Sequence, residues 1–362
     1  MLLVCIALTA CSGGAGGDDA VDDRGVEIGR RAEPYRIVYR LDDRSDPNVE
    51  PTTDEVWVRQ PFESRLETSR GSTLESVQIS AIDRLRLGTI DQPLVIARVP
   101  GLAVSDVRVA PVLDDAIDAG LLVRAGLRKV LDRRCELVRS GTLLGAGPLV
   151  PITDAEHAET CIDREGLVLE ETLFSEGKPT LHRVATTVDT SPDLTNDQFA
   201  VGDLTAAVDK GAGSTRPVDP HAGALGSFWV LGSDAVPRGF DLVGRYSIVP
   251  PQSDRFAVPG NPAIVAGTAD VYVRDSDFLV VWQGGTAGRV VAFPPTPGAR
   301  QIDGGALGAG EAVLSALGNE LHFPHVRGRF VHVVGTLTVR ELTVIARDLR
   351  ETQGTGLVYL DG

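Results

Sequence analysis

Alternation of apolar and polar side chains is the feature that most constrains the fold of this 362-residue chain. Every second side chain of residues 35–41 is apolar, as Tyr35, Ile37 and Tyr39 illustrate, whereas charged side chains such as Arg36 stand between them. A period of two is typical of a half-buried strand, because successive strand side chains point to opposite faces. One dry face and one wet face predict an antiparallel sheet that is covered on one side only.

Several later segments of the first half have the same strand character. They are residues 55–59, 62–68, 76–85, 94–99, 129–139, 161–174 and 179–188. Glu176 and Gly177 stand between two alternating runs and predict a hairpin turn. Residues 111–124 form the best helix candidate, with Pro111 at the start and Leu113 and Ile117 spaced for one face.

Residues 191–227 lose this pattern, and glycine and proline interrupt every possible element, which predicts a linker. Beyond it, the second domain opens with the segments 228–231 and 236–240, and strands are expected at 241–249, 269–274, 278–282 and 330–334. Both faces of 278–282 are apolar, so that strand should be covered on both sides. Thr338 and Glu341 match a capping box, and the apolar residues after them share one helical face, so a helix should follow the last strand.

The N-terminus resembles a bacterial lipobox, with Leu-Thr-Ala-Cys at 8–11 followed by small residues. The apolar run 2–8 is too short to span a bilayer, which needs about 20 residues, but it suits a signal h-region of about 7 to 15. We therefore expect export, cleavage before Cys11, acylation of Cys11, and anchoring to the outer face of the cell membrane. No basic residue precedes Arg24, so the true start is expected a few codons upstream. The alternative is a buried N-terminal strand with a chance cysteine.

Cysteine usage agrees with an exported chain. Cys5 would be removed with the signal and Cys11 would carry lipid, which leaves Cys135 and Cys161. Two remaining cysteines in an oxidising compartment are expected to form a disulfide, worth about 3 to 4 kcal/mol in the chain-entropy model. The alternatives are two buried free thiols or a zinc site, and the second lacks a CxxC pair or a neighbouring histidine.

Charge excludes some partners. The net charge of −15 argues against nucleic acid, which requires a basic surface. It also argues against electrostatic adhesion to anionic lipid, so acyl chains on Cys11 would have to hold the protein at the membrane. The glycine-rich, acidic segment after Cys11 predicts a flexible tether.

Three segments carry a resemblance to a known family: Tyr-Arg-Ile-Val-Tyr at 35–39, Val-Trp-Val-Arg-Gln-Pro-Phe-Glu-Ser-Arg at 56–65, and Cys-Ile-Asp-Arg-Glu-Gly-Leu-Val-Leu at 161–169. They are similar to the LolA-like group, which includes mycobacterial LppX/LprG-type lipoproteins and the N-terminal domain of RseB/MucB sigma-factor regulators. The order of elements in 228–352 is similar to the C-terminal domain of RseB/MucB proteins. The resemblance implies an actinobacterial envelope lipoprotein of α+β class. Its antiparallel half-barrel sheet would wrap around helices, and a smaller C-terminal α+β domain would follow.

The expected organisation is a signal peptide at 1–10, a lipidated tether at 11–33, a half-barrel domain at 34–190, a linker at 191–227, a second domain at 228–352 and a tail at 353–362. The resemblance implies that the half-barrel holds acyl chains. The expected cavity wall consists of Ile37, Tyr39, Val56, Val58, Phe62, Leu66, Leu167 and Leu169. The alternative is that these residues are a packed core, which any sheet with this alternation would have.

Motifs for catalysis are missing from the sequence. There is no GxSxG, no HExxH and no P-loop, because Gly177-Lys178 is followed by proline. His322, His325 and His332 form the one histidine cluster, and we expect core or solvated histidines there rather than metal ligands. No catalytic residue, metal or cofactor is therefore expected. Two functions remain: a membrane-anchored lipoprotein that binds an acylated lipid or hydrophobic ligand, or a regulator of RseB/MucB type that binds an anti-sigma factor.

Overall fold

The computed structural model describes residues 33–46, 48–59, 63–80, 84–89, 92–97, 113–118, 120, 122–141, 157–200, 214–221, 226–249, 267–275, 277–285, 299–315 and 318–360. Cys11, the signal peptide and Phe62 lie outside these ranges, and so do Pro111 and Leu121 of the expected first helix. Two large antiparallel sheets and one strand pair account for the strands of this part of the chain.

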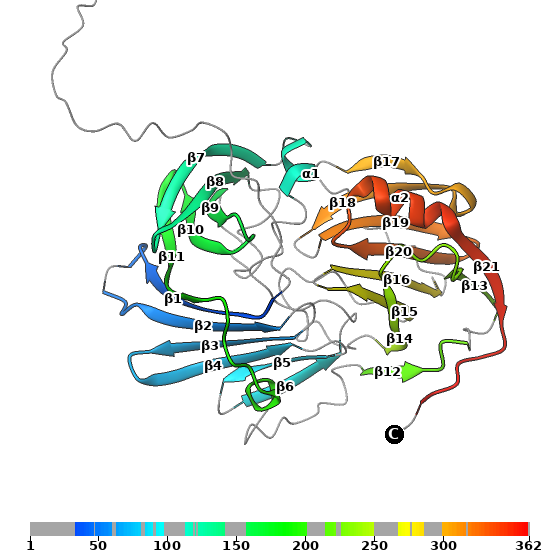
Figure 1. The fold of residues 1–362 in the computed structure, drawn as a ribbon, viewed down its shortest axis with the longest axis horizontal. Helices are drawn as coiled ribbons and strands as arrows, with labels where there is room; N and C mark the ends of the chain where they lie inside the picture. The colour runs from blue at the N-terminus through cyan, green and yellow to red at the C-terminus, as the bar shows by residue number, and fades with distance from the viewer. Residues whose placement is uncertain are drawn as a thin grey trace, which may run out of the picture.

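The first sheet contains eleven strands and bends through its width (Figure 1). Its strands are β1 (Tyr35–Asp43), β2 (Thr52–Arg59), β3 (Glu63–Arg70), β4 (Thr73–Ser80), β5 (Arg84–Thr89), β6 (Gln92–Ala97), β7 (Leu122–Val130), β8 (Arg133–Gly141), β9 (His157–Asp163), β10 (Val168–Ser175) and β11 (Lys178–Asp189). The order across the sheet is β6-β5-β4-β3-β2-β1-β11-β10-β9-β8-β7. Two meanders of neighbouring strands are thus joined where β1 pairs with β11, with Ile37 opposite Val188.

The expected antiparallel sheet and the hairpin at Glu176 and Gly177 are confirmed, but the predicted 129–139 strand is wrong. Leu131 and Asp132 both have positive φ, of 48° and 61°, and form the two-residue turn between β7 and β8. Such turns usually contain glycine or asparagine, and neither residue is present at this turn to mark it. The predicted 161–174 strand likewise divides into β9 and β10, and 76–85 divides between β4 and β5.

The predicted helix at 111–124 is much shorter than expected. The described helix, α1, covers only Leu113–Asp118, and β7 begins at Leu122. Gly120 has a φ of +71° and donates its N–H to the carbonyl of Ile117, a geometry that ends a helix. Of the helices expected inside the half-barrel, the described residues contain α1 alone. It packs through Leu113 and Ala116.

The second sheet contains eight strands in the order β12-β14-β15-β16-β20-β19-β18-β17. They are β12 (Ser214–Val218), β14 (Asp241–Val249), β15 (Gly267–Arg274), β16 (Asp277–Gly285), β17 (Arg300–Asp303), β18 (Ala309–Ser315), β19 (Gly318–Val326) and β20 (Arg329–Gly335). β13 (Gly226–Leu231) pairs separately with β21 (Leu349–Gly354). β12 lies within the expected linker and joins the sheet as an edge strand, a position that tolerates its Pro217.

Apolar side chains cover both faces of the second sheet. Leu279 and Val281 of β16 belong to one buried cluster, whereas Val280 and Trp282 belong to another, so the predicted two-sided burial of this strand is confirmed. α2 (Val339–Asp348) packs on the first of these faces through Leu342.

The start of α2 confirms the predicted capping box. The Thr338 hydroxyl accepts from the Glu341 N–H at 3.2 Å, and the Glu341 carboxylate accepts from the Thr338 N–H at 2.9 Å. α2 ends at Asp348, and Leu349 opens β21. In the described part of the chain, no helix has both the length and the apolar character that a membrane crossing requires.

Candidate functional site

The described members of the predicted cavity wall converge in the first sheet. Ile37, Tyr39, Val56, Val58, Leu167 and Leu169 belong to one contact cluster, called the inner cluster below, and each is at most 1% exposed. Leu66 is partly buried and packs against it. These seven side chains therefore lie on or against one buried surface, which draws on strands far apart in the chain.

The inner cluster has further members that were not assigned to the expected cavity wall. Tyr35, Val130, Cys135, Cys161 and Ala185 complete its buried set. Tyr35 shares the alternation of Ile37 and Tyr39, so that pattern already placed it on the same face. Ala185 faces Tyr39 across the β1–β11 pairing, and nothing local marks that contact.

A charged group lies beside this apolar surface. The Arg183 guanidinium is 3.6 Å from the centre of the Tyr39 ring, and its Nε is 3.8 Å from Asp54 Oδ2. Arg183 is 2% exposed, and the Thr68 hydroxyl donates to Asp54 at 2.7 Å. A guanidinium over an aromatic face is stabilised by the negative face of the ring, more strongly when water is excluded. The surface is thus apolar, with one charged side chain, Arg183, at its edge. Strand prediction from the sequence alone could not reveal this contact.

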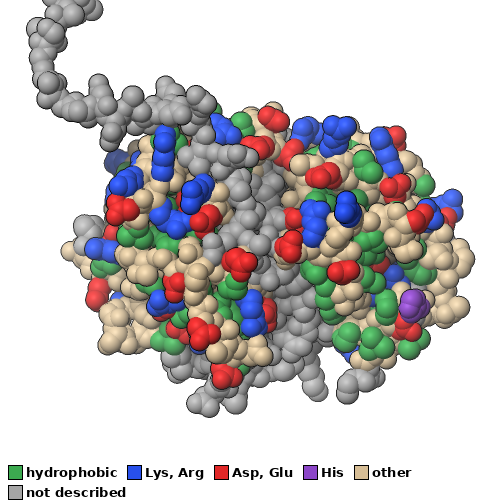
Figure 2. Space-filling view, in the orientation of Figure 1, with side chains coloured by type: hydrophobic (Ala, Val, Ile, Leu, Met, Phe, Trp, Pro, Cys, Tyr) green, Lys and Arg blue, Asp and Glu red, His purple; other side chains and the backbone are tan. Residues whose placement is uncertain are grey.

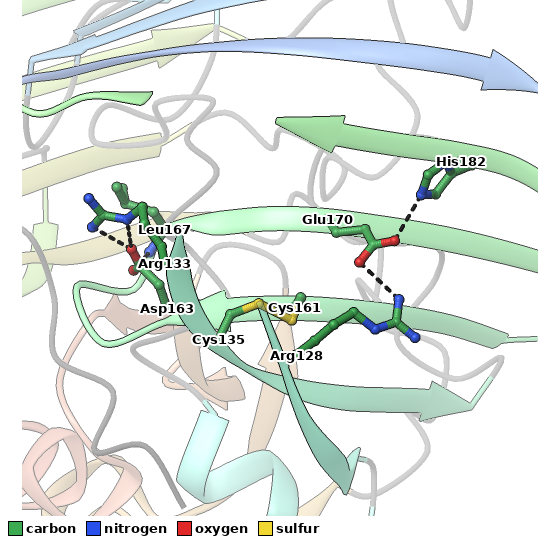
Figure 3. The surroundings of a disulfide bond; sticks show 8 residues. All are labelled: Arg128, Arg133, Cys135, Cys161, Asp163, Leu167, Glu170 and His182. Atoms are coloured by element: carbon green, nitrogen blue, oxygen red, sulfur yellow. Dashed lines mark hydrogen bonds and ion pairs between the residues drawn. A yellow bond between two sulfur atoms is a disulfide. The ribbon is translucent and has the colours of Figure 1, made fainter. Parts of the chain in front are cut away.

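The predicted disulfide between Cys135 and Cys161 is present and links β8 to β9 (Figure 3). Both cysteines are fully buried. Asp163 lies at the end of β9, where its carboxylate accepts from the N–H groups of Glu165 and Leu167, each at 2.9 Å. This carboxylate also accepts from Arg133 of β8 at 2.7 Å. The turn that precedes Leu167 is therefore held both by its own N–H groups and by a side chain of the neighbouring strand.

A row of three interacting charged or titratable side chains lies next to the disulfide (Figure 3). Arg128 of β7 donates to Glu170 of β10 at 2.8 Å, and Glu170 is 2.9 Å from His182 of β11. Burial opposes ionisation of Glu170, but hydrogen bonds from Arg128 and His182 outweigh it and lower the pKa of that carboxyl. Basic and acidic side chains are likewise interspersed over the described surface in view in Figure 2.

The three histidines of the cluster have different surroundings in the second sheet. His322 and His332 stack with ring centres 4.3 Å apart, and His322 Nε2 is 2.8 Å from Glu320, whereas His325 is exposed. Burial first, and the electrostatic influence of the neighbouring His322 second, hold the pKa of His332 well below its ordinary value. Within the described ranges, no group of three or more histidine, cysteine or acidic side chains is placed to hold a metal. His322 and His332 are both buried in the second sheet.

Comparison with known proteins gives no family by sequence, since neither a family model nor a curated protein matches. Among solved structures, the chain is similar to MucB in complex with MucA(peri), at 16% identity and a TM-score of 0.32, over 88% of this chain and 94% of that one. The MucA/MucB complex of Pseudomonas aeruginosa gives 17% identity and a TM-score of 0.32, over 88% and 93%. A LolA superfamily protein from Nitrosomonas europaea gives 9% identity and a TM-score of 0.23, over 49% and 94%. Likenesses this weak carry no argument about the site.

Proposed function

We propose that this chain is an exported, non-catalytic lipoprotein whose inner cluster binds the acyl chain of a lipid or another hydrophobic ligand. One observation carries the proposal: every described residue assigned to an acyl-binding wall lies on or against the same buried apolar surface. Ligand sites are lined mainly by apolar and aromatic side chains with a few placed polar groups, and Tyr39 with Arg183 supplies such a group here. Burial of each methylene of a ligand would contribute about 0.8 kcal/mol.

The proposal includes the membrane anchor. Acyl chains on Cys11, followed by a glycine-rich and acidic tether, would keep an acidic protein near the membrane that supplies its ligand. Replacement of Cys11 by serine should move the protein from the membrane fraction to the aqueous fraction. A Cys11→Ser variant that stays with the membrane would contradict the anchor.

A regulator that binds an anti-sigma factor is the second candidate. It is favoured by the second domain, which builds its own two-sided core and which a simple carrier does not require. Binding of a membrane-anchored anti-sigma factor and binding of a lipid are separable in the laboratory.

The experiment is direct extraction of ligand. The chain from Ser12 onward is made in a host with a cell envelope, purified without detergent, and analysed by native mass spectrometry and organic extraction. The proposal expects bound acylated lipid that organic solvent releases. A protein that is empty and stays empty when mixed with acylated lipids would refute it.

A further inference from the structure

One carboxylate joins the helix of the first domain to the second domain. Asp115 of α1 accepts a hydrogen bond from the side-chain amide of Asn319 at 2.8 Å and one from the N–H of Val339 at 3.4 Å. Arg300 lies 3.7 Å from its other oxygen. Three groups that are distant in the sequence from α1 therefore meet one carboxylate.

The second-domain side of this contact is well fixed. Asn319 is fully buried, and its amide also donates to the carbonyl of Leu337 at 2.8 Å. Val339 is the first residue of α2, directly after the capping residue Thr338. A carboxylate is favoured at this end of a helix because the first N–H groups lack partners within the helix and carry the positive end of its dipole.

The first-domain side leads back to the inner cluster. The opposite face of α1 packs through Leu113 and Ala116 into a cluster that contains Val168. The carbonyl of Val168 accepts from the hydroxyl of Tyr39 at 2.8 Å, and Tyr39 is a central member of the inner cluster. α1 thus lies between the candidate ligand surface on one side and the start of α2 on the other.

We propose that Asp115 latches the second domain to α1, and that a ligand at the inner cluster opens this latch. A ligand adds volume beside Tyr39 and the Val168 carbonyl that its hydroxyl contacts, and α1 packs in the cluster that contains the Val168 side chain, so this added volume shifts α1. Opening exposes Asn319 and the first turn of α2 to solvent. The latch stands on the contacts of Asp115 alone, whereas its opening by ligand rests on the proposed function.

The latch is tested by hydrogen exchange on the whole mature chain. In Asp115→Ala, amide exchange in residues 336–342 should accelerate by about fivefold, the factor that corresponds to the loss of one ordinary hydrogen bond. Asp114→Ala is the matched control, since Asp114 is the neighbouring residue, its side chain is 92% exposed, and its ion pair with Arg124 stays within the first domain. Exchange in residues 55–58 of β2, which are outside the cluster that contains α1, should change in neither variant, and this separates a latch effect from general unfolding. Equal exchange in Asp115→Ala and the parent protein would overturn the latch.

Coupling to ligand is tested on the same peptides, with delipidated protein before and after loading with a diacyl phosphatidylglycerol. Loading should accelerate exchange at 336–342 in the parent protein and add nothing in Asp115→Ala. Lipid that is retained by mass spectrometry without any change in exchange would overturn the coupling and leave the proposed function intact. Failure to retain lipid would overturn the proposed function together with the coupling, and the exchange of Asp115→Ala would still decide the latch.

Discussion

Removal of the disulfide should destabilise the first sheet by a calculable amount. Cys135 and Cys161 are 26 residues apart in the sequence and link neighbouring strands. For a loop of that length, the chain-entropy model gives about 12 cal/mol/K of lost unfolded-state entropy, or about 3.5 kcal/mol at 25 °C. Both sulfurs are buried in the inner cluster, so their replacement by alanine also removes some packing.

The assay is urea unfolding of the Cys135→Ala/Cys161→Ala double variant in oxidising buffer, followed by tryptophan fluorescence. Trp57 lies in the first sheet, whereas Trp229 and Trp282 lie in the cores of the second domain, so the two regions have separate reporters. The Trp57 transition should move to lower urea, and the transition of the second domain should stay in place. The parent protein refolded with its thiols reduced is the control and should lose less stability than the variant, because it keeps the packing of both sulfurs. A double variant within about 0.5 kcal/mol of the parent would show that the disulfide does not stabilise the fold, because that is the ordinary range for an inconsequential substitution.

Two further predictions concern the second domain. The Gln283 side chain accepts from the Trp229 N–H at 2.8 Å and donates to the Trp229 carbonyl at 2.6 Å. Gln283→Ala should therefore lower the free energy of unfolding, measured in urea, by about 1 to 3 kcal/mol. A smaller loss would show that water replaces these bonds. His332 has a lowered pKa in the folded protein because of burial, so the unfolded chain binds the proton more readily. Stability should therefore be full above the unfolded pKa of about 6.5 and decline as the pH falls below it. His332→Phe should flatten this decline while a change at the exposed His221 does not, and an unchanged pH profile in His332→Phe would contradict the assignment.

Local patterns in the sequence located the strand regions of the first sheet, although not every turn between them, because alternation is a local consequence of which face is buried. It also placed Ile37, Tyr39, Val56 and Val58 on one surface, since residues two apart on a strand must share a face. The capping box at Thr338 was found for the same reason: its partners are three residues apart.

Features that depend on contacts distant in the sequence were missed. The burial of Arg183 over Tyr39 requires the pairing of β1 with β11, which no local signal specifies. The contact of Asp115 with Asn319 spans 204 residues, a separation that no local pattern can specify. The turn at Leu131 was missed because it lacks the residues that usually adopt positive φ.

The most direct test of the central claim adds volume to the inner cluster. Ala185 is 3% exposed and faces Tyr39, so Ala185→Leu places three extra carbons on the proposed ligand surface. If the surface binds acyl chains, the variant should keep its unfolding free energy and lose bound lipid in native mass spectrometry. The same Ala→Leu change at the exposed Ala125 in the same sheet is the control and should retain lipid. A variant that loses about 1 to 3 kcal/mol of stability, the usual cost of overpacking, with its lipid content unchanged would show a packed core and contradict the account.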